Sequence, residues 1–418
     1  MLEHVVVVTD SLTVDGGSAK VALSSAIALA ESGLQVTVFA AAGQASPELA
    51  ACANLRIVCT EQGDALSSRN RLAGAVRGLW NRRARSRMTA LLATLDPART
   101  VVHVHSWTKA LSASVVASAV RAKFPVVLTL HEYFTACPTG CLYLHRDRAV
   151  CTIAPMSLAC VTKDCDSRSY AFKLYRVVRQ MIARSFGCIP SGIAEYITVS
   201  RFSRRILEPL LPARRRMHAV DNPVDAVREP RAHAEASDTF VFVGRLSAEK
   251  GGLLLAEAAR LAGVRVVFIG DGAEREAVLA VNPQAQFTGW LDRAGVTAHL
   301  RAARCVVVPS LWYETLGLVV LEAAALGVPA IVPNGTAARD LVVPGKTGLA
   351  FERGNALDLA AQLRALADAS LTERLSRNAY DAFWSKPPTM AAHVDELLST
   401  YAGVLGTVAP GARIARAS

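Results

Sequence analysis

The sequence predicts an α/β protein with two doubly wound domains, each built on a parallel sheet. Its 418 residues are too many for one hydrophobic core of ordinary size. Short runs of β-branched residues alternate with longer Ala- and Leu-rich stretches, which is the pattern of βαβ units. A polar, Pro-containing stretch at residues 222–238 divides this pattern into two series and is predicted to be the interdomain linker.

The first series predicts a Rossmann-like domain over residues 1–221. Each expected strand is a short apolar run, and helices are expected between the strands. Residues 131–169 interrupt the alternation, hold five of the nine cysteines and are interpreted as an insertion. The expected strands are Val5–Thr9, Gln35–Phe39, Leu55–Cys59, Thr100–His105, Pro125–Leu130, Tyr196–Val199 and Met217–Val220.

The second series predicts another Rossmann-like domain over residues 239–388. An amphipathic helix at residues 389–405 is expected to pack back towards the first domain, and a tail follows at residues 406–418. Ligands of such sheets bind at the carboxyl ends of the strands, so the two domains are expected to face a central cleft. The expected strands are Phe240–Val243, Arg265–Ile269, Gln286–Thr288, Cys305–Val308, Ala330–Val332 and Gly348–Phe351.

The composition is that of a globular protein, with 52% hydrophobic and 19% charged residues. The sequence has no apolar run long enough to span a membrane, and no basic leader precedes the first strand. We therefore expect a cytoplasmic protein whose thiols are reduced.

Positive charge is concentrated in the first half of the chain. Residues 1–220 hold 27 Lys and Arg against 14 Asp and Glu, a net charge of +13, whereas residues 221–418 hold 19 against 21, a net charge of −2. The arginine runs at 82–87 and 214–216 suit phosphates or anionic lipid headgroups, although a solvated arginine-rich face is equally consistent with them. No motif of a nucleic-acid-binding fold accompanies them, so we expect no nucleic-acid partner.

Two motifs of the second half suit a phosphorylated ligand. Gly244, Arg245 and Lys250 follow an expected strand, where glycine permits close approach and the two cations match a diphosphate. Glu314 and Glu322 flank a predicted helix start near Thr315, whose free amides favour an anion. Eight residues apart, the two glutamates are expected on one helix face about 12 Å apart, so that each reaches a different part of an extended ligand.

In the first half, Gly16 and Gly17 open a helix after the first strand, and His131 ends another strand. The glycines allow a ligand to approach backbone amides, but the GxGxxG fingerprint of a dinucleotide site is missing. His131 is expected to reach the cleft because it stands at the carboxyl end of its strand.

With these motifs, the chain resembles the retaining glycosyltransferases of family four, also called glycosyl transferases group 1, which have the GT-B fold. The likeness runs from Val5 to about Arg353. It is most specific in the second half, in the order and spacing of Gly244-Arg245, Lys250, Gly270-Asp271-Gly272, Phe287-Thr288-Gly289, Pro309-Ser310 and Glu314 to Glu322.

The resemblance implies a role for each matching residue. Arg245 and Lys250 would hold the donor pyrophosphate, Glu314 the transferred sugar and Glu322 the ribose, while His131 would face the sugar. Arg245, Lys250, Glu314 and His131 are thus the expected catalytic residues. The other expected contacts with the nucleotide sugar are Gly16, Gly17, Gly244, Gly270, Thr288, Gly289, Thr315, Leu316, Gly317, Leu318 and Glu322.

The resemblance further implies a metal-independent hexosyltransferase that retains anomeric configuration. Its acceptor would be a glycan or a lipid-linked sugar of a bacterial surface polysaccharide, and the basic first half would contact the anionic inner face of the membrane. Two alternatives remain, a sugar-nucleotide epimerase of the same architecture and a non-catalytic nucleotide-sugar-binding assembly subunit.

The cysteines of the insertion suggest a structural zinc ion. Thiolates close together in a loop-rich segment can bind zinc and order it, but the spacings lack paired CxxC motifs. Free thiols and disulfides are the alternatives. The family resemblance favours Cys137, Cys151, Cys160 and Cys165 as ligands and leaves Cys141 spare.

Overall fold

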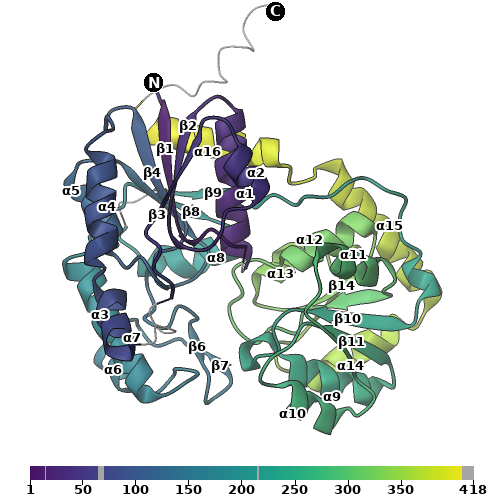
Figure 1. Cartoon of the computed structure of the whole chain (residues 1–418). Helices are drawn as coiled ribbons and strands as arrows, with labels where there is room; N and C mark the ends of the chain where they lie inside the picture. The colour runs from purple at the N-terminus through teal and green to yellow at the C-terminus, as the bar shows by residue number, and fades with distance from the viewer. Residues whose placement is uncertain (15, 65–69, 214–215, 407–418) are drawn as a thin grey trace, which may run out of the picture.

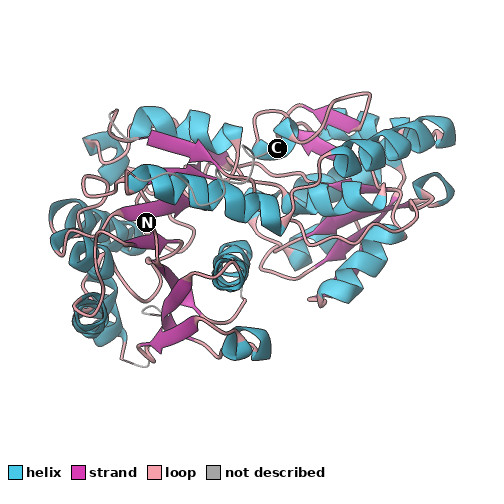
Figure 2. Ribbon diagram, turned by 90° about the horizontal axis from the view of Figure 1, so that it is seen from above, coloured by secondary structure: helices cyan, strands magenta, loops and turns pink. Residues whose placement is uncertain are grey.

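The computed structural model describes residues 1–406 except 15, 65–69 and 214–215. Two α/β lobes lie side by side, each with a sheet covered by helices on both faces (Figures 1 and 2). Two parallel sheets of this kind were predicted, and the prediction is confirmed.

The first sheet has seven parallel strands in the order β3-β2-β1-β4-β5-β8-β9. Its interior strand β1 is almost wholly buried, as expected of a hydrophobic run covered on both faces. The strands are β1 (His4–Ser11), β2 (Gln35–Ala42), β3 (Leu55–Cys59), β4 (Thr100–Val104), β5 (Val126–Leu130), β8 (Glu195–Thr198) and β9 (Arg216–Ala219).

Helices from the first half cover both faces of this sheet. α1 begins at Gly17, where Gly16 leaves the first helical amides without a side-chain cap. The helices are α1 (Gly17–Glu31), α2 (Pro47–Ala51), α3 (Arg71–Leu79), α4 (Arg82–Leu92), α5 (Ser114–Arg121), α7 (Tyr170–Ser185) and α8 (Arg201–Leu207), with η2 (Glu208–Leu210) after α8.

The insertion has little regular structure, as expected. It contains a short antiparallel hairpin of β6 (Tyr143–Leu144) and β7 (Ala149–Val150), followed by α6 (Leu158–Thr162). The hairpin lies at the edge of the first lobe that faces the second (Figure 1).

The second sheet has six parallel strands in the order β12-β11-β10-β13-β14-β15. Its order reverses beside β10, the switch point at which ligands of doubly wound sheets bind. The strands are β10 (Thr239–Val243), β11 (Arg265–Ile269), β12 (Gln286–Gly289), β13 (Cys305–Val307), β14 (Ala330–Pro333) and β15 (Gly348–Phe351).

The remaining helices cover the second sheet, except for the last, which returns to the first domain. There His393 of α16 meets Ser25 of α1 at 2.9 Å. The elements are η3 (Ala234–Ala236), η4 (Ala248–Lys250), α9 (Gly252–Ala262), α10 (Arg275–Val281), α11 (Arg293–Arg301), α12 (Leu318–Leu326), α13 (Ala337–Asp340), α14 (Ala356–Ala365), α15 (Ala369–Ser385) and α16 (Met390–Val404).

Candidate active site between the two domains

The loops after β10, β11 and β12 pack on one another at the carboxyl ends of their strands. The amide of Gly244 donates to the carbonyl of Ile269 at 2.9 Å, and the amide of Gly270 donates to the carbonyl of Gly289 at the same distance. A Cβ at Gly270 would lie 2.1 Å from the carbonyl oxygen of Gly244, so this contact requires glycine. Gly244, Gly270, Thr288 and Gly289 are therefore neighbours, as the motif order suggested.

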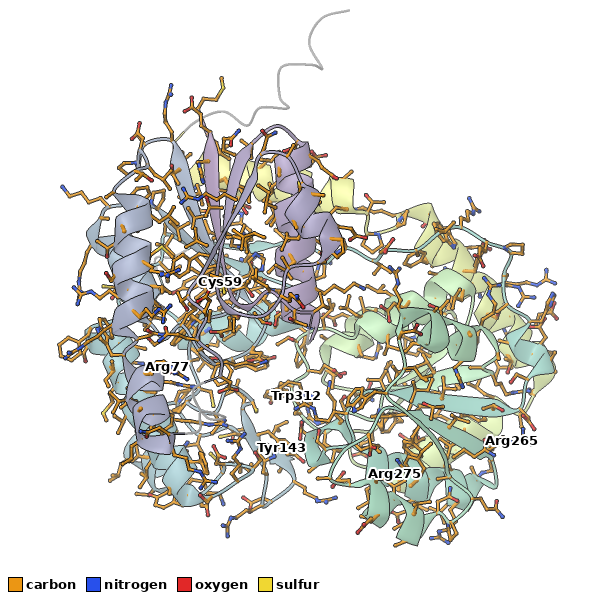
Figure 3. The ribbon with its side chains drawn as sticks, viewed as in Figure 1. Cys59, Arg77, Tyr143, Arg265, Arg275 and Trp312 are labelled. Carbon is orange, nitrogen blue, oxygen red and sulfur yellow. The ribbon has the colours of Figure 1, made fainter. Side chains whose placement is uncertain are left out.

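Lys250 and Glu314, from two different loops, form an ion pair at this edge. The second carboxylate oxygen of Glu314 accepts from the Ser310 hydroxyl at 2.6 Å. The Lys250 ammonium also lies 5.4 Å from the ring centre of Trp312, within cation–π range. Figure 3 labels Trp312 and, below it, Tyr143 of the insertion in the region between the lobes.

The helix after this loop begins later than expected. α12 starts at Leu318 rather than near Thr315, and Gly317 precedes it without a side-chain cap. Glu314 therefore lies outside the helix, and the prediction that it shares a helix face with Glu322 is wrong. The cause is Thr315, whose hydroxyl and carbonyl are both bound to the first domain, which holds this stretch out of helical geometry.

Thr315 joins the two domains directly. Its hydroxyl donates to the carbonyl of His131 at 2.9 Å, and its own carbonyl accepts from the hydroxyl of Ser200 at 2.6 Å. Gly17 faces Leu318 nearby, because a Cβ there would lie 3.8 Å from the Leu318 side chain. The start of α1, the end of β5 and the start of α12 thus meet across one cleft.

His131 is the outermost of three stacked histidines. Its Nε2 is 3.0 Å from Nδ1 of His105, and the His105 ring lies 4.1 Å from that of His103. His103 is held by hydroxyls of Tyr401 at 2.6 Å and Thr129 at 2.7 Å. Burial, with a smaller contribution from His393, lowers the pKa of His131 to about 3. A neutral His131 can bind a sugar hydroxyl but cannot supply a proton at neutral pH.

Glu322 faces a different part of the cleft. It lines a pocket of about 330 Å³ together with Leu318 of α12, Lys20 and Ser24 of α1, and residues 223–226 of the predicted linker. This pocket has walls from both halves of the chain. Arg245 is exposed beside β10, and Leu316 lies between Thr315 and the Gly317 cap.

The insertion reaches the second domain, which the sequence reasoning did not anticipate. Arg148 of the β6–β7 hairpin bonds to Glu274 before α10 at 2.6 Å. His145 lies 4.0 Å from Glu249, the neighbour of Lys250. The only sequence signal was the position of the insertion directly after a strand end that faces the cleft.

The structure does not support the predicted zinc site. Cys137, Cys151, Cys160 and Cys165 do line one small cavity. However, among the described residues no group of three or more His, Cys, Asp or Glu side chains could hold a metal ion. The buried ammonium of Lys173 lies 3.2 Å from the sulfur of Cys165 and 3.6 Å from that of Cys160, so a cation already lies between these thiols.

Two facing Rossmann-like domains that meet across a cleft define the GT-B class of glycosyltransferase fold. Sequence comparison gives the family within that class. The profile named Glycosyltransferase Family 4 matches residues 15–228, about half of the chain, and the profile named Glycosyl transferases group 1 matches residues 224–382. The chain belongs to glycosyltransferase family 4.

Curated relatives share the family rather than one substrate. A GDP-mannose-dependent alpha-mannosyltransferase of Mycobacterium tuberculosis is 34% identical over 184 residues, 43% of this chain and 46% of that protein. A lipopolysaccharide core biosynthesis glycosyltransferase, LpsE of Rhizobium meliloti, is 34% identical over 170 residues, 39% of this chain and 46% of that protein. The matches span about half the length of these relatives.

Solved structures share the fold at low sequence identity. HepE of Anabaena in complex with UDP is 16% identical, with a TM-score of 0.66 over 96% of this chain and 100% of that one. Sucrose-phosphate synthase of Thermosynechococcus elongatus is 17% identical, with a TM-score of 0.69 over 97% and 99%. At these identities the likeness establishes the two-domain fold alone.

Proposed function

We propose that this protein transfers a hexosyl group from a nucleotide-diphosphate sugar to a glycan or lipid-linked acceptor, with retention of configuration. The observation that carries the proposal is the Lys250–Glu314 pair, held by Ser310 beside the uncapped start of α12. A cation and free helical amides suit a diphosphate, and a carboxylate suits sugar hydroxyls. The names of the relatives, a mannosyltransferase and a lipopolysaccharide core glycosyltransferase, support this substrate class.

In the proposed reaction the acceptor hydroxyl attacks the anomeric carbon while the bond from that carbon to the phosphate oxygen breaks. The leaving phosphate oxygen takes the acceptor proton on the same face, so the balance needs no metal. Lys250 and Arg245 stabilise the charge that grows on the diphosphate. Neutral His131 hydrogen-bonds the sugar, Glu322 binds the ribose, and Gly16, Gly17, Thr288 and the amides of residues 316–318 complete the donor contacts.

We further propose that the acceptor belongs to a bacterial surface polysaccharide and that the protein attaches peripherally to the inner face of the membrane. Within the part of the chain that the structure describes, no helix combines the length and apolarity needed to cross a bilayer. The net charge of +13 in residues 1–220 favours an anionic lipid surface.

Donor hydrolysis tests the proposal without knowledge of the acceptor. Purified protein is incubated with GDP-mannose and UDP-glucose, and the release of nucleoside diphosphate is measured. We expect release from one donor, greatly reduced in Lys250→Ala. Binding without release would favour the assembly subunit, and a change of the sugar on an intact nucleotide would favour the epimerase.

A further inference from the structure

Two neighbouring helices of the first domain expose apolar side chains to solvent. On α3, Leu72 is 81% exposed and Val76 is 66% exposed, one helical turn apart. On α7, Leu174, Val178 and Met181 are exposed at the spacing of one helix face. These five side chains are named the α3–α7 face. Each of the other described helices exposes at most one large apolar side chain.

The two helices pack against each other. The hydroxyl of Tyr175 on α7 donates to the carbonyl of Ala75 on α3 at 3.1 Å. Both helices lie on the side of the first lobe that points away from the second, where Figure 3 labels Arg77. The α3–α7 face is therefore free of the interdomain contacts.

The helices around this face carry charge of one sign. α3, α7 and α4, which follows α3 directly, together contain ten Lys and Arg residues and no Asp or Glu. The exposed members are Arg71, Arg82, Arg83, Arg85, Arg87 and Arg184. Of these, only Arg83 has an ion pair among the described side chains, a long one of 3.7 Å to the exposed Glu61.

We propose that the α3–α7 face docks on a bilayer that contains anionic phospholipid. Aliphatic side chains enter the headgroup boundary while the arginines around them meet lipid phosphates, which is how interfacial helices bind. Protein interfaces are enriched in aromatic side chains, whereas none of these five side chains is aromatic. The α3–α7 face would be the surface through which the proposed peripheral attachment to the membrane occurs.

Docking there would bring lipid close to the acceptor side of the cleft. The buried side of α7 holds the segment that follows His131, because Arg179 donates to the carbonyl of Pro138 and Gln180 to that of Thr135. One helix therefore contacts the wall of the cleft with one side and exposes the apolar stripe on the other. A lipid-linked acceptor would reach the cleft over a short path.

Vesicle flotation tests the surface. Wild-type protein is mixed with vesicles of phosphatidylglycerol and phosphatidylcholine, or of phosphatidylcholine alone, at low and high salt. We expect salt-sensitive binding to the anionic vesicles only. Leu72→Asp/Val76→Asp and Leu174→Asp/Met181→Asp are each expected to weaken binding about tenfold or more. Each double substitution removes apolar groups that would enter the lipid and adds negative charge.

The matched control is Leu279→Asp/Leu357→Asp, which changes two exposed leucines of the second domain and is expected to bind as wild type does. Donor hydrolysis without lipid should be unchanged in all three variants, which separates this inference from the proposed chemistry. Equal binding by wild type and by both face variants would overturn the inference. The inference would also be overturned if the wild-type protein bound no vesicles but sedimented as a dimer, and the face variants sedimented as monomers.

Discussion

At the scale of single residues, the Lys250–Glu314 pair shows how the loops after β10 and β13 are held together. The pair is half-buried, and Ser310 fixes the second oxygen of the carboxylate. Each side chain therefore positions the other, so removal of one leaves a partly buried charge without its partner. In the proposed reaction both also act on the donor, Lys250 on the diphosphate and Glu314 on the sugar.

Lys250→Ala and Glu314→Ala are expected to lower kcat for donor hydrolysis about a hundredfold or more, because each removes transition-state stabilisation of a few kcal/mol. The measurement is the initial rate at saturating donor. Arg265→Ala is the control, since it removes an exposed cation of the same domain that pairs with Asp238 at 3.5 Å. Near-wild-type turnover in Lys250→Ala would contradict the assigned role.

The buried histidines link stability to pH. Burial, with smaller contributions from His131 and His393, lowers the pKa of His103 to about 3. Burial likewise holds the pKa of His105 well below 6.5. Unfolded histidine titrates near pH 6.5, so below that pH the unfolded state binds more protons than the folded state. The stability contributed by the neutral rings is present above pH 6.5 and is lost as the pH falls towards 3.

His131 is lowered in the same way, so between pH 7.5 and 5.5 the free energy of unfolding of the first domain should fall by about 4 kcal/mol from His103, His105 and His131 together. Urea denaturation at both pH values measures it. His103→Gln, which can still hydrogen-bond to Tyr401 and Thr129, is expected to lose about a third of this pH dependence. An unchanged pH dependence in this variant would exclude His103 as a source.

At the scale of elements, the sequence predicted strands better than it predicted the ends of helices. Short apolar runs identified the strands of both sheets, because a strand that is buried on both faces needs apolar side chains on both faces. The start of α12 was misplaced because it depends on the contacts of Thr315 with Ser200 and His131, residues more than a hundred positions away. Local propensity carries no information about such contacts.

The insertion likewise depends on a contact that its own sequence does not indicate. The family resemblance favoured four of its cysteines as zinc ligands, and all four line one cavity, but the described residues form no metal site there. The cysteine spacing could not indicate Lys173, whose ammonium comes from α7 and lies against Cys165 and Cys160. Most of the proposed donor residues, by contrast, lie in strand-end loops, where sheet topology itself brings distant motifs together.

The loop after β10 provides a test of that topology. Gly251 has φ +73, and a Cβ there would lie 2.1 Å from the carbonyl oxygen of Pro309, at the base of the loop that carries Glu314. Gly251→Ala is expected to displace this loop and to lower the donor hydrolysis rate at least about tenfold, since small misplacements of this kind are costly.

Gly263→Ala is the matched control. Gly263 has φ +69, but nothing lies within 4 Å of the Cβ position. Both variants suffer the strain of a left-handed alanine, about 1 kcal/mol, and only Gly251→Ala meets Pro309. If the two variants lose equal activity, the strain alone is responsible and the loop contact is irrelevant.

At the scale of the whole molecule, the lobes are joined by several connections, three of which flank the candidate site. The chain crosses through residues 222–238 and returns with α16, and Thr315 bonds directly to His131 and Ser200. The third connection is the insertion, whose Arg148 bonds to Glu274 beyond the donor loops. The chain therefore crosses the interface at one end of the candidate site, and the Arg148–Glu274 bond crosses it at the other.

We predict that the Arg148–Glu274 contact stabilises the arrangement of the two domains seen in this structure. Arg148→Ala and Glu274→Ala should each raise KM for the donor roughly fivefold, since a charged hydrogen bond of this exposure contributes about 1 kcal/mol. The double variant should raise KM no further than either single variant does, because the two residues act through one contact. Arg146→Ala is the control, as Arg146 pairs with Asp164 inside the insertion at 2.7 Å and does not reach the second domain. Additive losses in the double variant, or an equal rise of KM in Arg146→Ala, would show that the bond does not govern closure.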